Sequence, residues 1–389
     1  MKATTAPSAA PVRFDPLLLC AVLSLVSLGL VMVYSASAVM AQDKLGDSLY
    51  FLYRQLMAAG MGVVAMAVGM KVGWRRLARL AYPLLLVTLV LMVLVLIPGI
   101  GTTAGGARRW IRFPGFGLQP AEVAKVAWVV YLSYSLAKKR EKVATFSVGF
   151  LPHLLLCGLL VGLCMLQPDF GSSVLLVFLL FALLFAAGTK VSYLVGSVLL
   201  ALPLAYAAIA RSPYRMKRVL AFLDPWAHRH DIGYQVAESL MSIGSGGLTG
   251  LGLGDGRQKL FFLPEAHTDF IFAIIGEELG LVGVVLLVAL YAIVIWRGIR
   301  ASLAAPETFG TYLGLGLTSI IAFQATVNMC VAMGLLPTKG LTLPFVSYGG
   351  TSLVVLMGAA GVLLSLSASA ETAGNRTLRS GGDMREVAA

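Results

Sequence analysis

The sequence predicts an all-α, polytopic membrane protein. Of its 389 residues, 58% are apolar and only 12% are charged, whereas a soluble domain carries about a quarter charged residues. The apolar residues are gathered in long uncharged runs, and a helix of about 20 such residues spans the hydrocarbon core of a bilayer. This composition excludes a soluble globular enzyme, a disordered chain and a disulfide-rich secreted module.

About ten transmembrane helices are expected from these runs. Eight runs carry no charge, and two carry charge near one end: Glu122 and Lys125 lie in one, Glu277 and Glu278 in the other. The first run is too long for the core of a signal peptide, so it is interpreted as a retained span. In chain order, the predicted spans are residues 16–42, 55–70, 80–107, 120–137, 143–168, 170–189, 191–210, 270–296, 308–338 and 340–370.

Short basic loops give the orientation of these helices. Residues 71–79 and residues 138–142 each carry four basic side chains, and both segments follow an even-numbered span, as do Arg297 and Arg300. Basic loops are retained on the cytoplasmic side of a membrane. Residues 15–370 are therefore predicted to form the membrane domain, and the tails 1–14 and 371–389, rich in small and polar residues, to lie in the cytoplasm.

A large extracytoplasmic loop follows from this topology. Residues 211–268, between helices seven and eight, lie outside the cell, and loops of this length commonly carry function. The loop is rich in glycine from about residue 243 to residue 256. We expect short amphipathic or re-entrant helices against the membrane, with irregular backbone buried on protein, rather than an independent domain.

Charged residues inside spans are costly and often mark functional sites. Glu122 and Lys125 are three residues apart, so they share a helix face and can neutralise each other. This spacing leaves two interpretations open: a pair that only makes insertion tolerable, or a polar cavity that opens outward.

Asp269 stands at the start of the predicted eighth helix, at a membrane interface. From its position alone it is either a capping or first-turn acid favoured by the helix dipole or a functional carboxylate. The three cations Arg215, Lys217 and Arg218 are likewise either snorkelling side chains or a phosphate clamp.

Metal and nucleotide sites are not indicated. His228 and His230 lack further ligands at a recognisable spacing, and the glycine-rich stretch lacks the Gly-Lys-Ser/Thr ending of a phosphate loop. The four cysteines lie singly within apolar runs, which argues against a disulfide framework.

Five sequence blocks nevertheless resemble the signature of one known family. They are GARRWI (106–111), QPAE (119–122) with Lys125, GYQ (233–235), LPEAHTDF (263–270) and LPFVSYGG (343–350). These blocks are similar to those of the SEDS proteins (shape, elongation, division and sporulation), and the resemblance runs from about Asp15 to Ser369. The blocks LPTKGLT (336–342), FLDPW (222–226) and DSLYFL (47–52) favour FtsW, the cell division branch; RodA and SpoVE are relatives.

The resemblance implies a peptidoglycan glycosyltransferase. Such enzymes polymerise lipid II, an undecaprenyl-pyrophosphate disaccharide peptide, into β-1,4 glycan strands on the outer face of the bacterial cytoplasmic membrane, here for septal cell-wall synthesis. The reaction is inverting, with polyprenyl pyrophosphate as the leaving group. The resemblance also implies a class B penicillin-binding protein (an FtsI-like transpeptidase) and other divisome proteins as partners at the division septum; no nucleic acid is expected.

The essential acid of the family corresponds to Asp269, which is predicted to be catalytic. Sugar transfer needs a base for the acceptor hydroxyl, and desolvation raises the pKa of a carboxylate so that it serves as a base near neutral pH. The charge that develops on pyrophosphate needs cations already in place. The residues predicted to bind substrate are Arg108, Arg109, Trp110, Glu122, Lys125, Arg215, Lys217, Gln235, Lys259, Glu265, His267, Lys339 and Ser347.

One departure from the family pattern concerns a basic residue. Many division members carry it two positions before the Gln-Pro pair, where this chain has Gly117, although Arg112 lies nearby. No cofactor is assigned with certainty; a divalent cation, Mg²⁺ or Mn²⁺, could assist at the pyrophosphate, although no ligand cluster is dedicated to it.

Two other function classes remain as alternatives. A lipid II flippase would use the intramembrane charges and many glycines for alternating access, but no inverted repeat is evident and the polar residues gather on the outer side. A non-catalytic divisome scaffold that activates a transpeptidase would make Asp269 replaceable.

Overall fold

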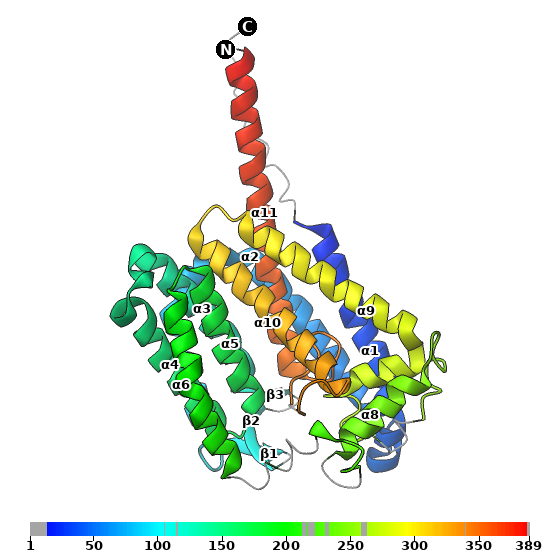
Figure 1. Ribbon diagram of the computed structural model, residues 1–389. Coiled ribbons are helices and arrows are strands. Elements are labelled where there is room, and N and C mark those ends of the chain that lie inside the picture. The colour runs from blue at the N-terminus through cyan, green and yellow to red at the C-terminus, as the bar shows by residue number, and fades with distance from the viewer. Residues whose placement is uncertain are drawn as a thin grey trace.

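Long helices form a bundle that carries one small sheet at its end (Figure 1). The computed structural model describes residues 14–104, 106–113, 116–211, 216, 222–229, 233–257, 263–338 and 340–386. Its helices are α1 (Pro16–Leu45), α2 (Tyr50–Leu94), α3 (Pro120–Lys139), α4 (Leu151–Leu166), α5 (Phe170–Ala186), α6 (Val191–Ala210), α8 (Tyr234–Ser245), α9 (Ile271–Leu303), α10 (Thr308–Ala332) and α11 (Gly350–Glu386). A 3₁₀ turn, Arg140–Ala144, and a π-helical turn, Phe146–Phe150, lead into α4.

The prediction of a polytopic helical membrane protein is confirmed. Among the described residues, six helices are long and apolar enough to cross a membrane: α1, α2, Phe146–Leu166, α9, α10 and Gly350–Ser369 of α11. Two shorter apolar helices, Phe170–Ala186 and Val191–Pro203, accompany them. The count of ten spans stays a prediction. Helix α11 continues past the predicted membrane domain into the tail 371–389 and ends at Glu386.

Helix α2 contains the predicted span 55–70 and the first part, 80–94, of the span 80–107. Its 45 residues would measure about 68 Å if straight, more than twice the hydrocarbon thickness. The helix is interrupted at Gly73, where φ is 72° and ψ is 155°, a backbone conformation that favours glycine. The next residue, Trp74, is buried and donates from its backbone nitrogen to Ser365 and from its indole to Ser369 on α11. The bend is therefore fixed by packing against α11.

A three-stranded antiparallel sheet lies between α2 and α3. Strand β1 (Gly101–Ala104) pairs with β2 (Ala107–Phe113), which pairs with β3 (Phe116–Leu118). The predicted helical span 80–107 is therefore wrong beyond Leu94. Pro98 and the glycines around it end the helix, since proline lacks an N–H and glycine costs a helix entropy. The sheet and α8 lie at one end of the bundle, and the C-terminal part of α11 leaves the other end (Figure 1).

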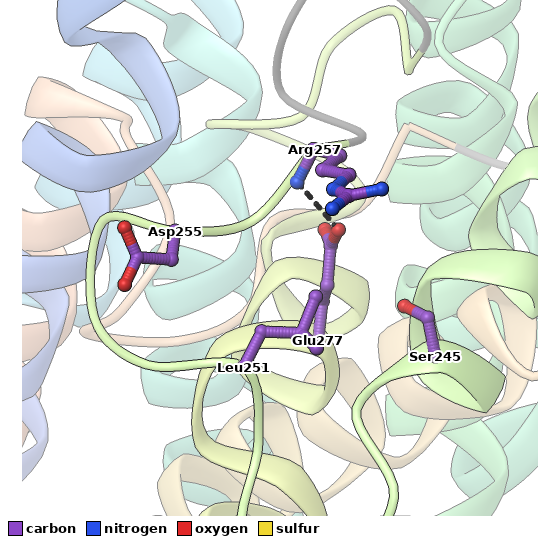
Figure 2. Close-up of a pocket in the computed structure, with 5 residues that line it drawn as sticks. All are labelled: Ser245, Leu251, Asp255, Arg257 and Glu277. Atoms are coloured by element: carbon purple, nitrogen blue, oxygen red, sulfur yellow. Dashed lines mark hydrogen bonds between the residues drawn. The ribbon is translucent and has the colours of Figure 1, made fainter.

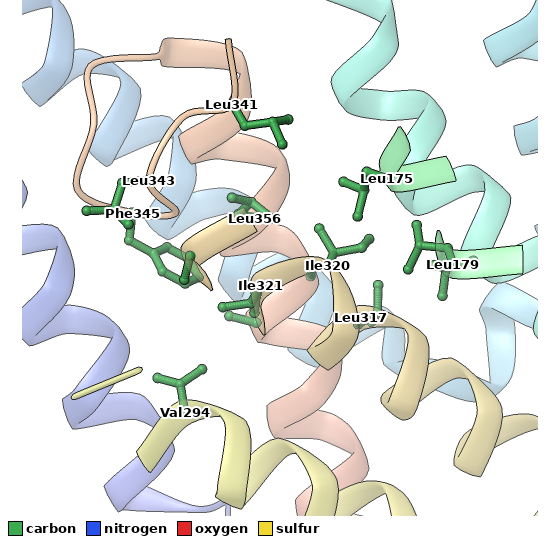
Figure 3. Close-up of a cluster of buried hydrophobic side chains, with 14 of the residues drawn as sticks. Leu175, Leu179, Val294, Leu317, Ile320, Ile321, Leu341, Leu343, Phe345 and Leu356 are labelled. Carbon is green, nitrogen blue, oxygen red and sulfur yellow. The ribbon is translucent and has the colours of Figure 1, made fainter. Parts of the chain in front are cut away.

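The connection between α10 and α11 is irregular and partly inserted into the bundle. Helix α10 ends at Ala332 and α11 begins at Gly350, so the predicted spans 308–338 and 340–370 extend too far into this segment. Figure 3 shows side chains of the connection beside α10, α5 and α9. Leu341, Leu343 and Phe345 are almost completely buried, and they anchor the connection by their apolar side chains.

The opposite end of the bundle is joined by an ion pair between α1 and α9. Asp15 caps α1 by accepting from the backbone nitrogens of Leu17 and Leu18 at 3.0 and 3.1 Å, and its carboxylate also pairs with Arg297. An exposed pair between Arg75 and Glu307 lies at 2.9 Å. All four charged residues fall in segments predicted to be cytoplasmic or to border the cytoplasm.

The glycine-rich stretch lies against a break in α9. At Gly280 the backbone of α9 is non-helical, with φ 61° and ψ −161°. Residues 247–252 supply hydrogen-bond partners for the backbone groups that the break leaves free. The bonds join Leu251 N to Glu277 O (3.0 Å), Gly252 N to Glu278 O (3.1 Å), Leu281 N to Gly247 O (3.0 Å) and Val282 N to Leu248 O (3.1 Å).

Two buried carboxylates hold the rest of this stretch. Glu277 accepts from the backbone nitrogen of Arg257 at 2.7 Å, and Glu278 accepts from that of Gly254 at 3.1 Å. A cavity of about 430 Å³ opens beside them and is lined by Ser245, Leu251, Asp255, Arg257 and Glu277 (Figure 2). Buried acids thus fix an irregular segment onto the long apolar helix α9.

Candidate active site

Asp269 lies in a turn immediately before α9 and keeps part of its surface exposed. The carbonyl of Glu265 closes this turn by accepting from Thr268 N at 3.1 Å and from Phe270 N at 3.3 Å. Phe270, not Asp269, is the N-cap residue of α9, and no side chain caps the helix. The capping interpretation of Asp269 is therefore wrong, and its carboxyl is available for another role.

Three successive backbone carbonyls of the turn are each held by a donor from α10 or from the connection that follows it. Because these carbonyls precede α9, they take no part in its hydrogen bonds, and each one needs another donor. The three bonds run from Tyr348 N to His267 O (2.9 Å), from Ser347 Oγ to Thr268 O (2.5 Å) and from Asn328 Nδ2 to Asp269 O (2.9 Å).

The electrostatic surroundings favour the protonated form of Asp269. Burial of the carboxyl is the main cause that raises its pKa to about 7. The negative charges of Glu265 and Asp169 raise the pKa further, whereas the positive charge of Arg109 lowers it. A carboxyl with a pKa near neutrality is suited to accept a proton during catalysis.

Arg109 and Asp169 reach this place from two other elements. Arg109, on β2, donates to the backbone carbonyls of Gln167 and Pro168, so its guanidinium is fixed next to the start of α5. Asp169 caps α5 by accepting from Ser172 N at 3.0 Å. The sequence prediction included Arg109 but missed Asp169, whose only signal was a Pro-Asp pair between two apolar spans.

An aromatic cluster borders the Asp269 turn. The ring centroid of His267 lies 4.7 Å from that of Phe51 and 5.6 Å from that of Tyr348. Burial lowers the pKa of His267, which favours the neutral imidazole. Gln55, on α2, donates to the carbonyl of Ser347 at 3.1 Å. The first turns of α2 thus support the same segment that holds Asp269.

Glu122 and Lys125 form a buried pair in α3. Their exposed fractions are 6% and 1%, and Lys125 Nζ lies 2.5 Å from Glu122 Oε1. The pairing predicted from their spacing is therefore present. Its role in substrate binding stays a prediction.

The remaining predicted site residues are distributed more widely. Ser347 is buried, and its hydroxyl is engaged with Thr268 O and Leu343 N. Among the described residues, no hydrogen bond or ion pair joins Asp269 to Arg108 and Trp110 on β2 or to Gln235 in the first turn of α8. Glu265 and His267 share the turn of Asp269. Four predicted cations lie outside the described residues: Arg215, Lys217, Lys259 and Lys339.

Metal binding finds little support in these side chains. Within the described part of the chain, no group of three or more histidine, cysteine, aspartate or glutamate side chains could hold a metal ion. Asp169, the carboxylate that acts on Asp269 from α5, already accepts from Ser172 and Gln119.

Residues 16–372 match the family FTSW_RODA_SPOVE, described as cell cycle protein. The chain is 48% identical over 355 residues to the probable peptidoglycan glycosyltransferase FtsW of Geobacter metallireducens, covering 91% of this chain and 95% of that protein. It is 42% identical over 356 residues to stage V sporulation protein E of Bacillus subtilis, with coverage of 91% and 96%.

Solved structures agree with this result. A chain from a peptidoglycan synthase complex, described as coordinating polymerization and crosslinking, is similar with a TM-score of 0.78 and 32% identity, over 92% of this chain and 98% of that one. RodA of Thermus thermophilus is similar with a TM-score of 0.67 and 30% identity, over 91% and 97%. These similarities confirm the predicted fold and enzyme class, that of the glycosyltransferases. The chain belongs to the FtsW/RodA/SpoVE family, the SEDS proteins.

Proposed function

We propose that the chain polymerises lipid II into β-1,4 glycan strands for septal cell-wall synthesis, with Asp269 as the general base. One observation carries this proposal: the partly exposed residue Asp269, whose carboxyl has a pKa of about 7, stands on a turn that three hydrogen bonds hold. The turn lies at the outer end of the bundle in the predicted topology. Relatives named probable peptidoglycan glycosyltransferase supply the substrate class.

The proposed reaction forms one bond and breaks another. The 4-hydroxyl oxygen of the acceptor sugar attacks the anomeric carbon of the donor, and the bond from that carbon to polyprenyl pyrophosphate breaks. The hydroxyl proton passes to the carboxylate of Asp269, and the leaving group departs from the opposite face, so the anomeric centre is inverted. A base with a pKa near the working pH combines a useful ionised fraction with a strong drive for proton transfer.

Arg109 is proposed to act on the pyrophosphate. Its Nε and Nη2 atoms donate to backbone carbonyls, which hold the guanidinium in one orientation. A guanidinium carries five N–H donors, so others are available to an anion. Because its charge also acts on Asp269, Arg109 lies close enough to connect the base with the leaving group, where a fixed cation stabilises developing charge.

The proposal includes partners and a location. We place the chain in the bacterial cytoplasmic membrane at the division septum, with both termini in the cytoplasm, together with a class B penicillin-binding transpeptidase and other divisome proteins. Its similarity to a chain of a peptidoglycan synthase complex supports such a pairing. The basic segments around Arg75 and Lys138 support the orientation.

The test is glycan synthesis from purified lipid II in detergent by the chain with its transpeptidase partner. We expect polymer from the parent complex and a loss on the order of 10²–10⁴-fold for Asp269→Asn, as for removal of a general base. Asp43→Asn is the matched control, since Asp43 is an exposed acid at the outer end of α1. Near-parent polymer from Asp269→Asn would contradict the proposal. Lipid II translocation in liposomes by that variant, without polymer from the parent, would establish a flippase instead.

A further inference from the structure

Asn328, on α10, joins two segments that are distant in sequence. Its side chain is 2% exposed, and its Nδ2 atom donates to the carbonyl of Asp269 at 2.9 Å and to that of Leu341 at 2.7 Å. Only the NH₂ end of an amide can face two carbonyl oxygens, so these contacts fix the orientation of the side chain. Both of its N–H groups are thereby used.

The two carbonyls have no other source of donors in regular structure. Asp269 precedes the first residue of α9, and Leu341 lies in the irregular connection between α10 and α11. A carbonyl that is withdrawn from water and left unpaired is strongly unfavourable. Asn328 therefore determines the separation between the turn that carries Asp269 and the backbone of residues 340–341, the Leu341 segment.

The Leu341 segment also passes the carboxyl itself. A Cβ atom placed on Gly340 would lie 3.5 Å from Oδ2 of Asp269, so the backbone at residue 340 borders the carboxyl. Asn328 thus holds both sides of the space in which the carboxyl stands: the turn that bears it and the segment that shields it. A change in their separation would alter the direction of the carboxyl and its access to water.

We infer that Asn328 is a positioning residue for glycosyl transfer, which keeps the Asp269 carboxyl oriented and partly shielded by clamping its backbone to the Leu341 segment. The inference rests on the proposed role of Asp269 as the base. The charged groups that act on Asp269 are Glu265 from its own turn, Arg109 from β2 and Asp169 from the start of α5. Among the described residues, the hydrogen bonds of Asn328 go to two backbone carbonyls and not to these charged side chains.

The experiment compares Asn328→Leu with Gln324→Leu in the complex with the transpeptidase partner. Gln324 lies one turn earlier on α10, is equally buried, and has no hydrogen-bond partner for its amide among the described residues, so its replacement removes no such bond. Polymer synthesis is measured as kcat and as KM for lipid II between about pH 5 and pH 9, which brackets the titration of the base.

We expect Asn328→Leu to lower kcat about 100-fold, since a small misplacement of a catalytic group has this effect, while KM stays near the parent value. The acidic limb of the pH profile should move to lower pH, because a carboxyl that is no longer held becomes better hydrated and its pKa falls toward the ordinary value. Gln324→Leu should have the kcat of the parent, and its acidic limb should lie at the same pH as that of the parent.

A second variant, Asn328→Ser, retains one donor on a smaller side chain and should shift kcat and the limb in the same direction by less. It decides the question in the same way if the leucine variant does not fold. The inference is overturned if kcat and the acidic limb of the pH profile both match those of the parent. It is also overturned if activity falls only in proportion to the amount of folded protein while the acidic limb stays at the pH of the parent. Activity of Asp269→Asn would instead overturn the proposed function, so the two failures are distinguishable.

Discussion

Lys125 and Glu122 neutralise each other inside α3, with Nζ of the lysine 2.5 Å from Oε1 of the glutamate. Both side chains are more than nine-tenths buried, and the second oxygen of Glu122 has no hydrogen-bond partner among the described residues. The carboxylate therefore depends on this one lysine for compensation of its charge. Such a pair is strongly destabilised by loss of one member and much less by loss of both.

Single and double replacement of this pair should differ sharply. We expect Glu122→Gln or Lys125→Met alone to cost about 3–5 kcal/mol of stability, because each leaves a buried group uncompensated, and the double variant to recover most of it. Thermal unfolding in detergent and polymer synthesis measure the two effects. A double variant that unfolds like the parent but makes no polymer would assign the pair to the catalytic cavity.

The pH dependence of kcat should follow Asp269. Because the proposed base, Asp269, would work only when ionised and its pKa is about 7, activity of the parent should rise with pH through neutrality. Glu265 raises this pKa and Arg109 lowers it. Glu265→Gln should thus move the acidic limb of the kcat profile to lower pH, whereas Arg109→Gln should move this limb to higher pH. Shifts in the same direction would show that another group controls the profile.

Stability should depend on pH in the opposite sense. The pKa of Asp269 is raised in the folded protein from 3.8 to about 7, so between these values the folded state binds more protons than the unfolded state. The contribution of this group to stability therefore falls as the pH rises through that window. Asp269→Asn should melt at a higher temperature than the parent above neutrality, with the difference vanishing near the lower value. An equal difference at every pH would contradict this linkage.

The contact between the glycine-rich stretch and α9 should not tolerate a methyl group. Gly250 has a φ of 83°, and a Cβ there would lie 2.1 Å from the carbonyl oxygen of Glu278. Gly250→Ala should therefore cost more than about 2 kcal/mol through strain alone and lower the melting temperature. Gly244→Ala serves as the control, since Gly244 lies in α8 with nothing within 4 Å of its Cβ position. Equal melting temperatures for the two variants would contradict the close approach.

Topology can be tested with single cysteines in a variant that lacks the four native ones. Asp255 and Glu141 are both exposed, and they fall in segments predicted on opposite sides of the membrane. An impermeant thiol reagent added to intact cells should label Asp255→Cys, and Glu141→Cys only after permeabilisation. The reverse pattern would place Asp269 on the cytoplasmic side.

The helices were predictable because hydrocarbon leaves the backbone few choices. An uncharged run of spanning length must satisfy its own backbone groups, so it forms a helix, and α1, α5 and α9 begin within one residue of the predicted starts. Absence of charge does not distinguish a helix from an apolar hairpin at the surface. For this reason the prediction carried residues 101–107 into the third span, where Gly101–Ala104 form β1 instead.

The site was predictable only where its chemistry is local. The Glu122–Lys125 pair follows from a spacing of three, and Asp269 lies in a recognisable sequence block. Asn328 and Asp169 act on Asp269 from 59 and 100 positions away, and no short-range pattern links residues at such separations. The only signal of Asn328 was a polar residue within an apolar run, and that of Asp169 was an acid between two such runs. A buried amide and a helix cap produce these signals equally well.

The donors that hold the carbonyls of His267, Thr268 and Asp269 come from residues that the ribosome adds later: Tyr348, Ser347 and Asn328. During synthesis the acid therefore enters the membrane well before the groups that orient it. A nascent chain that has inserted α9 but not α10 and α11 carries Asp269 without the three hydrogen bonds that hold its turn. A chain released before Asn328 lacks all three of these donors, so the carbonyls of His267, Thr268 and Asp269 would have to find other partners.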